Sequence, residues 1–296
     1  MEETKKHLPV LINEVISYLA PQKGESYLDL TAGYGGHADR ILEVTQNYKD
    51  AVLNDRDENA ILALQAKYQK VKPQIVHDDF YSTALRLVES GQQFDMVLAD
   101  FGVSSPQLDE KVRGFSFAQS SRLDMRMDER QERDAWQVVN KWSERELAEK
   151  FRRFGELSDG RAKLLAREIV HHRPIETTGE LADLIKQKSG FSKKHPATQV
   201  FQAIRIVVND ELTQIEQTLP LISKLLKPDG RMALISFHSL EDRIVKKFLN
   251  EASDHGIESE LEVLTKKPVV AGEYELVNNP RARSAKLRAA KKPKSN

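Results

Sequence analysis

The stretch that decides the fold is DLTAGYGGH, residues 29–37, which ends a β-rich run at 27–30 and leads into a helical run. Glycines at 33, 35 and 36 let the backbone approach a ligand that a Cβ atom would exclude. The order G-x-G-x-x-A is the turn of nucleotide-binding βα units, and NAD, flavin and S-adenosylmethionine (SAM) enzymes all use it. A plain tight turn is the alternative, so the stretch predicts a ligand-binding turn without choosing the ligand.

Outward from this turn, β-rich runs alternate with helical ones. Strands are expected at 51–53, 75–76 and 94–99, with a helix at 59–68. A further strand is expected at 231–237, behind the turn Lys227-Pro228-Asp229-Gly230. This alternation predicts an α/β fold with a parallel, Rossmann-like sheet that carries helices on both faces.

A long helical segment interrupts the sheet pattern. Ser104 and Arg231 are 127 positions apart, whereas a βαβ crossover needs only about a dozen residues. Apolar residues at helical spacing fill the interval, and one long helix is expected from Thr198 to Leu219. We therefore predict an inserted helical domain at 107–200, between the two parts of a sheet domain at 1–106 and 201–296.

Composition excludes several classes of protein. The 296 residues include no Cys, which removes disulfide frameworks, thiolate nucleophiles and Cys-ligated metals. The charged N-terminus lacks the apolar block of a signal peptide, and no apolar run approaches the roughly 20 residues of a membrane helix. We expect a cytoplasmic protein without a membrane partner, as a monomer or homodimer.

Polar side chains follow the predicted strands at the edge where open α/β sheets bind ligands. Asp55 ends the second strand, nineteen residues after Gly36, where a carboxylate can accept both hydroxyls of a ribose. Asp100 ends the fourth strand and is the strongest candidate for the site, with a buried Asp that caps the next turn as the alternative. Phe80 follows the third strand and is placed to pack on an adenine ring, or else in the ordinary core.

The sequence contains no motif typical of a metal site or of a hydrolase. Its eight histidines form no H-E-x-x-H or H-x-H pair, and no Ser-His-Asp order can be built. His238 stands at a strand end, and Ser239 with Asp242 resembles a capping box that opens a helix. We predict no metal site.

Net charge is zero, with 45 basic and 45 acidic residues, which argues against binding nucleic acid by bulk electrostatics. Two local patches are nevertheless basic. One contains Lys193 and Lys194 with His195, and the other is the tail at 281–296, which has seven basic residues and no acid. Both patches suit phosphate groups, with a solvated loop and a frayed tail as the alternatives.

Together these motifs resemble the bacterial SAM-dependent methyltransferases that modify cytosine N4 in small-subunit ribosomal RNA, the family known as RsmH or MraW. The likeness covers nearly the whole chain in order. The chain departs from the family pattern at Thr31-Ala32 and at Asn54, and neither change removes a functional group. The motifs are His7 with PVL at 9–11, GYGGH at 33–37, DRD at 55–57, DFGVSSPQLD at 100–109, RGFSF at 113–117, LDMRMD at 123–128, HPAT at 195–198, FQAIRI at 201–206, ISFHSLEDRIV at 235–245 and NPRARS at 279–284.

The resemblance implies a class I SAM-dependent methyltransferase fold whose inserted domain recognises the substrate. It also implies the reaction, methylation of a cytidine N4 amine in the decoding centre of 16S ribosomal RNA, with the small ribosomal subunit as partner. SAM would be the methyl donor, without a metal. The residues implied for the cofactor site are Gly33, Gly35, Gly36, His37, Asp55, Phe80, Asp100 and Gln107.

Asp100 is also the candidate catalytic residue, because DNA amino-methyltransferases carry [DNS]-P-P-[YFW] at the equivalent strand end. Whether Asp100 contacts the base, the cofactor or both stays open, since this chain departs from that motif. Lys291, Lys292 and Lys294 are expected in a disordered tail. The predicted substrate-binding residues are Ser104, Ser105, Pro106, Lys193, Lys194, His195, His238, Arg281 and Arg283.

Two other classes of function share some of these features. A nicotinamide dehydrogenase would have the glycine turn and Asp55, but this function does not account for the polar residues at 100–107. A non-catalytic RNA-binding factor that keeps a SAM-binding fold is the second alternative.

Overall fold

A computed structural model describes residues 9–102, 113–189, 196–254 and 259–294. The chain divides into two compact units. The sheet unit comprises Met1–Gly102 and Leu212–Asn296, and the helical unit comprises Val103–Glu211. Within the described ranges, no helix combines the length and the apolar character that a membrane span requires.

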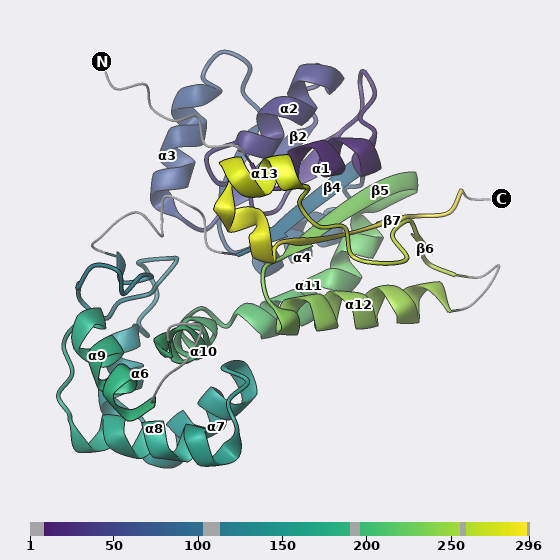
Figure 1. The fold of residues 1–296 in the computed structure, drawn as a ribbon. Helices are drawn as coiled ribbons and strands as arrows, with labels where there is room; N and C mark the ends of the chain where they lie inside the picture. Colours follow the sequence, from purple (N-terminus) through teal and green to yellow (C-terminus); the bar gives the residue numbers. More distant parts are fainter. Residues whose placement is uncertain (1–8, 103–112, 190–195, 255–258, 295–296) are drawn as a thin grey trace. The chain divides into compact units, whose positions relative to one another are not determined.

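The sheet unit contains a seven-stranded sheet in the order β3-β2-β1-β4-β5-β7-β6 (Figure 1). The strands β1 to β5 pair in parallel, whereas β7 runs antiparallel to both β5 and β6. The predicted turn at 227–230 forms a bulge in β5, because Leu226 pairs with Phe94 and the next pair is Arg231 with Met96. The strands are β1 (Tyr27–Asp29), β2 (Ala51–Asp55), β3 (Gln74–His77), β4 (Phe94–Phe101), β5 (Leu226–Ser236), β6 (Glu262–Val263) and β7 (Lys286–Lys291).

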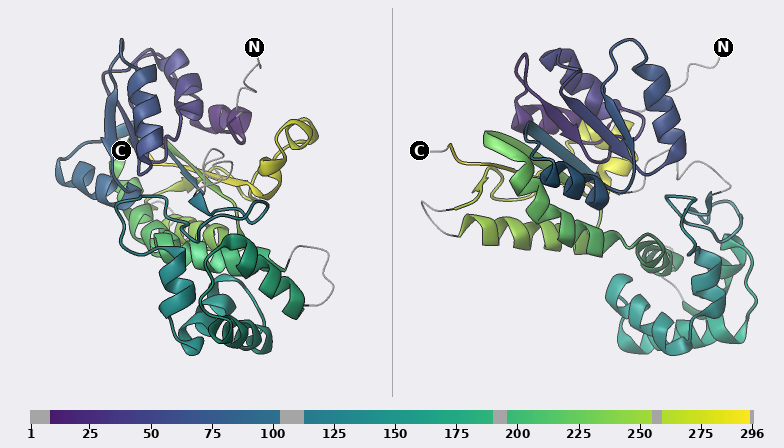
Figure 2. Two further views of the ribbon diagram at one scale, coloured as in Figure 1. Left: turned by 90° about the vertical axis from the view of Figure 1, so that its left-hand side faces the viewer. Right: turned by 180° about the vertical axis from the view of Figure 1, so that it is seen from behind.

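Helices cover both faces of this sheet (Figure 2). Alternate strand residues point to opposite faces, so Tyr27 and Leu28 enter two different apolar clusters. The prediction of a helix-covered α/β sheet is therefore confirmed. One face carries α1 (Ile12–Leu19), α2 (Gly36–Thr45), α3 (Glu58–Lys67), α13 (Glu273–Asn278) and the 3₁₀ helix η3 (Pro280–Ser284), and the other carries α4 (Phe80–Glu89), α11 (Glu211–Leu225) and α12 (Ser239–Ser253).

The helical unit has an apolar core of its own, in which Phe151, Leu165 and Ile204 are buried. The sequence-predicted boundary at 201 falls inside α10, whose buried residues belong to this core, so the helical unit extends to Glu211. Its helices are α6 (Ala135–Lys141), α7 (Glu144–Phe154), α8 (Asp159–His171), α9 (Thr178–Ser189) and α10 (Ala197–Asn209).

The prediction of one continuous helix from Thr198 to Leu219 is wrong, because the backbone breaks at Asp210. Asp210 adopts a left-handed conformation, with φ 49° and ψ 37°. The buried Asn209 side chain holds the break by accepting from the Met127 N–H and donating to the Met125 carbonyl, each at 2.8 Å. These partners are more than eighty residues away, so no local pattern predicts them.

The prediction of a disordered basic tail is also wrong. Lys291 is the last residue of β7, which lies between two other strands of the sheet. The Lys292 ammonium donates to the carbonyls of Ser223 and Leu226, at 3.3 and 3.0 Å, and Lys294 lies within the described residues after the strand. The strand buries Leu287, Ala289 and Ala290, which offsets the cost of ordering so basic a segment.

Candidate functional site

The turn between β1 and α2 is built on glycine conformations. Gly35 has φ +80° and stands immediately before α2, in a region that side chains with a Cβ rarely adopt. A Cβ on Gly36 would lie 2.7 Å from Cγ of Pro9, so a side chain there would displace the proline ring. The turn therefore depends on glycine at both positions, and it ends at the open N–H groups of α2.

Asp55 links the end of β2 to this turn. Its Oδ2 accepts from the Gly33 N–H at 2.7 Å, and its Oδ1 accepts from the Asp57 N–H at 2.9 Å. Burial raises the pKa of Asp55, and the two backbone N–H groups oppose that shift. A carboxylate has about four acceptor positions, so Asp55 keeps lone pairs for hydroxyl groups of a ligand. Asp57 is the N-cap of α3, and its side chain accepts from the Asn59 N–H at 3.0 Å.

Two further aspartates end the neighbouring strands. Asp29, at the end of β1, is buried and accepts from the Tyr27 hydroxyl at 2.7 Å and from the Thr31 N–H at 3.2 Å. Burial raises the pKa of Asp29 to about 7, against the effect of these hydrogen bonds. Near the end of β4, the backbone N–H of Asp100 donates to Thr31 Oγ1 at 2.6 Å.

The Asp100 carboxyl is the unusual group of this edge. Its Oδ1 is buried and has no hydrogen-bond partner among the residues that the structure describes. Burial raises the pKa of Asp100 to about 8, and the negative charges of Asp29 and Glu241 raise it in the same direction. A buried acceptor without a donor is costly, and a ligand that brings a donor or a positive charge would stabilise this one.

His37 lies in the first turn of α2 and is buried. Its Nε2 lies 2.9 Å from the Val10 carbonyl oxygen. Burial lowers the pKa of His37 to about 4, so the ring is neutral near pH 7 and donates through Nε2. The ring of His37, a residue predicted to bind the cofactor, is thus hydrogen-bonded to the N-terminal segment of the sheet unit.

Phe80, the first residue of α4, is buried in the core beneath the sheet. Its ring centroid is 5.6 Å from that of Phe101, and the Arg56 guanidinium carbon lies 5.9 Å from the Phe80 centroid. With 6% of its surface exposed, Phe80 offers little contact area to a ligand.

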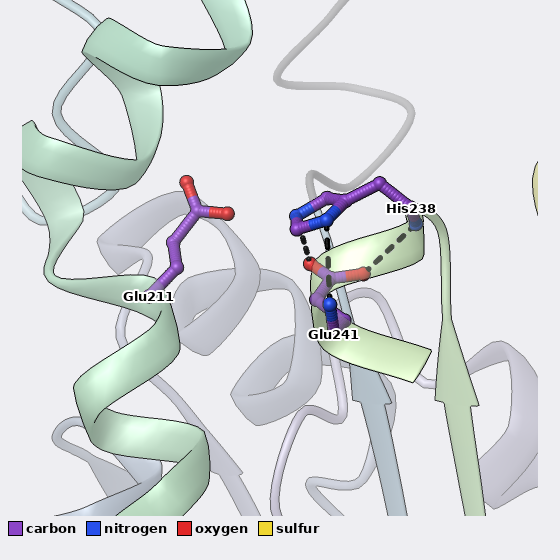
Figure 3. A group of neighbouring side chains, drawn as sticks. All are labelled: Glu211, His238 and Glu241. Carbon is purple, nitrogen blue, oxygen red and sulfur yellow. Dashed lines mark hydrogen bonds and ion pairs between the residues drawn. The ribbon is translucent and has the colours of Figure 1, made fainter. Parts of the chain in front are cut away.

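His238 and Glu241 form a capping box at the start of α12 (Figure 3). Glu241 Oε2 accepts from the His238 N–H at 3.2 Å, while His238 Nδ1 accepts from the Glu241 N–H at 3.4 Å. His238 Nε2 also lies 2.9 Å from Glu241 Oε1. The predicted capping pair of Ser239 and Asp242 is therefore wrong by one residue, since His238 itself caps the helix.

The predicted basic residues of the C-terminal segment lie in η3. Arg281 is partly exposed and Arg283 is exposed. The remaining predicted site residues lie outside the described residues, namely Ser104, Ser105, Pro106, Gln107, Lys193, Lys194 and His195.

Sequence reasoning missed three residues of this edge, which are Asp29, Thr31 and Glu241. Asp29 and Thr31 flank the end of β1 within the quoted stretch, but the stretch was interpreted through its glycines. Glu241 follows His238 at the capping-box spacing, which was a usable signal. The described site thus gathers acidic groups from three adjacent strand ends beside a glycine turn, an arrangement suited to a ligand with hydroxyl groups and positive charge.

Comparison with known proteins places the chain in one family. Residues 4–293 match the MraW methylase family. A protein named ribosomal RNA small subunit methyltransferase H from Trichormus variabilis is 46% identical over 297 residues, which cover 98% of this chain and 93% of the relative. The protein of that name from Cyanothece sp. is 47% identical over 289 residues, covering 97% and 94%.

Among solved structures, an rRNA methylase from Streptococcus thermophilus aligns with a TM-score of 0.42 at 8% identity, over 96% of this chain and 94% of that one. The sequence match to the family runs through both the sheet unit and the helical unit, and the two named relatives are matched over almost their whole length. This chain belongs to the MraW methylase family.

Proposed function

We propose that this protein transfers a methyl group from SAM to the N4 amine of a cytidine in the decoding centre of 16S ribosomal RNA. Membership of the MraW methylase family supports the class of reaction, and the names of the relatives support ribosomal RNA of the small subunit as substrate. The observation that carries the assignment of the site is the meeting of Asp29, Asp55 and Asp100 at one strand edge beside the glycine turn.

The residues present fit SAM better than a nicotinamide dinucleotide. SAM has ribose hydroxyls, a sulfonium and an ammonium group but no phosphate, whereas NAD presents a doubly charged pyrophosphate. Burial and mutual repulsion disfavour the ionised forms of these carboxyls, so a bound cation stabilises them by favouring ionisation, whereas a phosphate would add to the repulsion. In this proposal Asp55 accepts the ribose hydroxyls, Asp100 faces the positive charge, and the other cofactor residues are Gly33, Gly35, Gly36, His37, Phe80 and Gln107.

When bound, SAM supplies a methyl group on a cationic sulfur, which is open to in-line attack. The protein then has to hold the acceptor amine within about 3–3.5 Å of that carbon, in line with the bond that breaks. Asp100 Oδ1, free of protein donors among the described residues, accepts a hydrogen bond from the amine and directs its lone pair. With a cationic ligand beside it, the Asp100 carboxyl would be ionised and could take the proton that the amine loses on methylation and pass it to solvent.

Cytosine N4 is a poor nucleophile, because its lone pair is delocalised into the ring. The target base also has to leave its stack to reach a strand edge, which costs least in a single-stranded or distorted segment. We assign recognition of that segment to the helical unit. Lys193, Lys194, His195, Arg281 and Arg283 are assigned to RNA phosphates, and Ser104, Ser105, Pro106 and His238 to the neighbourhood of the base. The transfer uses no metal in this proposal.

Methyl transfer from labelled SAM tests the proposal. The acceptors are naked 16S RNA, immature small-subunit particles and mature 30S subunits, followed by digestion to nucleosides. Label in N4-methylcytidine from a decoding-centre fragment is the expected result. SAM binding without transfer to any of the three acceptors would favour the non-catalytic RNA-binding factor, and tighter binding of NADH than of SAM would favour the dehydrogenase.

A further inference from the structure

One peptide group near the start of the chain is held from both sides. Its carbonyl oxygen, on Val10, accepts from His37 Nε2 at 2.9 Å. Its N–H, on Leu11, donates to Glu275 Oε1 at 2.8 Å. His37 belongs to α2 and Glu275 to α13, so this single peptide group connects a helix of the cofactor turn to one from the far end of the sequence.

The residue after this peptide group is strained. Leu11 is fully buried and has φ 55° and ψ 33°, in the left-handed region that a leucine rarely adopts. Such a conformation persists only where the surroundings determine it, and here the two side-chain hydrogen bonds fix the peptide group that precedes it. Hydrogen bonds at both ends of one amide also polarise it, so each strengthens the other.

Glu275 connects α13 to the N-terminal segment through its hydrogen bond with the Leu11 N–H. The neighbouring Tyr274 and Val277 are 81% and 80% exposed, and Leu276 makes the apolar contact with the core. Burial raises the pKa of the Glu275 carboxyl, as does the nearby Glu14, while the Leu11 N–H opposes the shift. The carboxyl thus accepts this hydrogen bond in partly buried surroundings, despite the cost of removing its charge from water.

The held peptide group adjoins the cofactor turn. Pro9 directly precedes Val10, and its ring occupies the space that a Cβ on Gly36 would take. We infer that Glu275 is a positioning residue for cofactor binding: by holding the Leu11 N–H, it keeps Pro9 seated on Gly36 and so sets the affinity for SAM without touching it. This inference rests on the proposed binding of SAM at the glycine turn.

Three variants of the full chain test the inference by calorimetry with SAM. Glu275→Ala removes the acceptor and should weaken SAM binding severalfold, with about tenfold as the upper limit set by the loss of a hydrogen bond to a charged group. Glu275→Gln keeps an acceptor oxygen and should stay within about twofold of wild type. Glu273→Ala is the matched control, because it removes an exposed acid from the same helix and should change nothing.

Amide hydrogen exchange supplies a readout that needs no activity. In the ligand-free protein, Glu275→Ala should speed exchange of the Leu11 amide by about tenfold or more. In the wild type, SAM should slow exchange of the same amide, because the coupling between two sites is reciprocal. This second measurement applies even where Glu275→Ala does not fold.

Three results would overturn the inference: wild-type SAM affinity in Glu275→Ala, a Gln variant as weak as the Ala variant, or a Leu11 amide whose exchange SAM leaves unchanged. A wild-type protein that binds no SAM would instead refute the proposed function. The faster exchange expected of Glu275→Ala without ligand would still report whether Glu275 holds the peptide group.

Discussion

Asp242 Oδ1 accepts a hydrogen bond from Arg288 Nε at 2.7 Å, which ties the first turn of α12 to the middle of β7. Arg288 is buried and Asp242 is half-buried, with 8% and 14% of their side-chain surfaces exposed. Lys286 lies at 3.3 Å from the second oxygen of the same carboxylate. Burial alone would raise the pKa of Asp242, but the hydrogen bonds and charges of Arg288 and Lys286 hold it below its usual value. A basic residue of the C-terminal segment therefore stabilises the sheet.

Replacing one partner of this pair should destabilise the protein. Arg288→Ala leaves a half-buried carboxylate with Lys286 as its remaining partner, and we expect a loss of about 2 kcal/mol in the free energy of unfolding. Urea unfolding measures it, with Lys247→Ala on the exposed face of α12 as the control. An Arg288→Ala protein as stable as the control would show that the pair contributes nothing.

Asp100 should make the stability of the ligand-free protein fall as pH rises. Its folded pKa of about 8 lies above the ordinary value of 3.8, so the folded state binds the proton more tightly than the unfolded state does. The penalty is absent below about pH 4, grows up to about pH 8 and is constant beyond. Asp100→Asn should therefore be more stable than wild type at pH 8.5, by roughly 2–4 kcal/mol, and equal to it near pH 4.

Thermal unfolding of both proteins across pH 4 to 9 checks this expectation. Asp29, whose pKa is raised to about 7, also makes stability fall with rising pH in both proteins. The quantity to compare is therefore the difference in stability between wild type and Asp100→Asn at each pH. Parallel curves would remove Asp100 from the buried edge. Asp100→Asn should also abolish methyl transfer, which would separate its role in catalysis from its cost in stability.

Asp55→Ala should weaken SAM binding about tenfold or more, because the carboxylate both accepts ribose hydroxyls in our proposal and fixes the Gly33 N–H. Asp57→Ser is the matched control, since serine keeps the cap of α3 while an acid is removed two residues away. Calorimetry of the two variants decides the matter. Equal affinities in Asp55→Ala and wild type would exclude Asp55 from the site.

The arginines of η3 should contribute to RNA binding through charge alone. Arg281→Ala with Arg283→Ala should lower the slope of log affinity against log salt by about 0.7 to 0.9 for each phosphate that is no longer neutralised, and leave SAM affinity unchanged. Lys246→Ala with Lys247→Ala removes two charges from α12 and serves as the control. An unchanged slope in the arginine pair, with a reduced slope in the lysine pair, would place the RNA on α12.

The alternation of strands and helices and the glycine turn were predictable, because they depend on local periodicity and on backbone conformations that few residues adopt. The break at Asp210 was not, since no Gly or Pro marks it and its stabilising partners, Met125 and Met127, are distant in sequence. Strand β7 was not predictable either, because its lysines and arginine flank only short apolar residues. It is ordered by pairing with β5, a strand that is distant in sequence.

Within the site, Asp55 and Asp100 were predictable from their places at strand ends, which bring side chains of different strands to one edge. The pairing of His37 with Glu275 across a single peptide group was not, because 238 positions separate the two residues and neither belongs to a motif that names the other. Sequence position also offers no sign that Phe80 is so deeply buried, since core packing and ligand packing favour the same residue type.

The most direct test of the account is nucleoside analysis of 16S RNA after incubation of immature small subunits with methyl-labelled SAM and either wild type or Asp100→Asn. The account predicts label in N4-methylcytidine from the decoding-centre fragment with the wild type, and none with the variant. Label in any other nucleoside, or equal labelling by the two proteins, would contradict it.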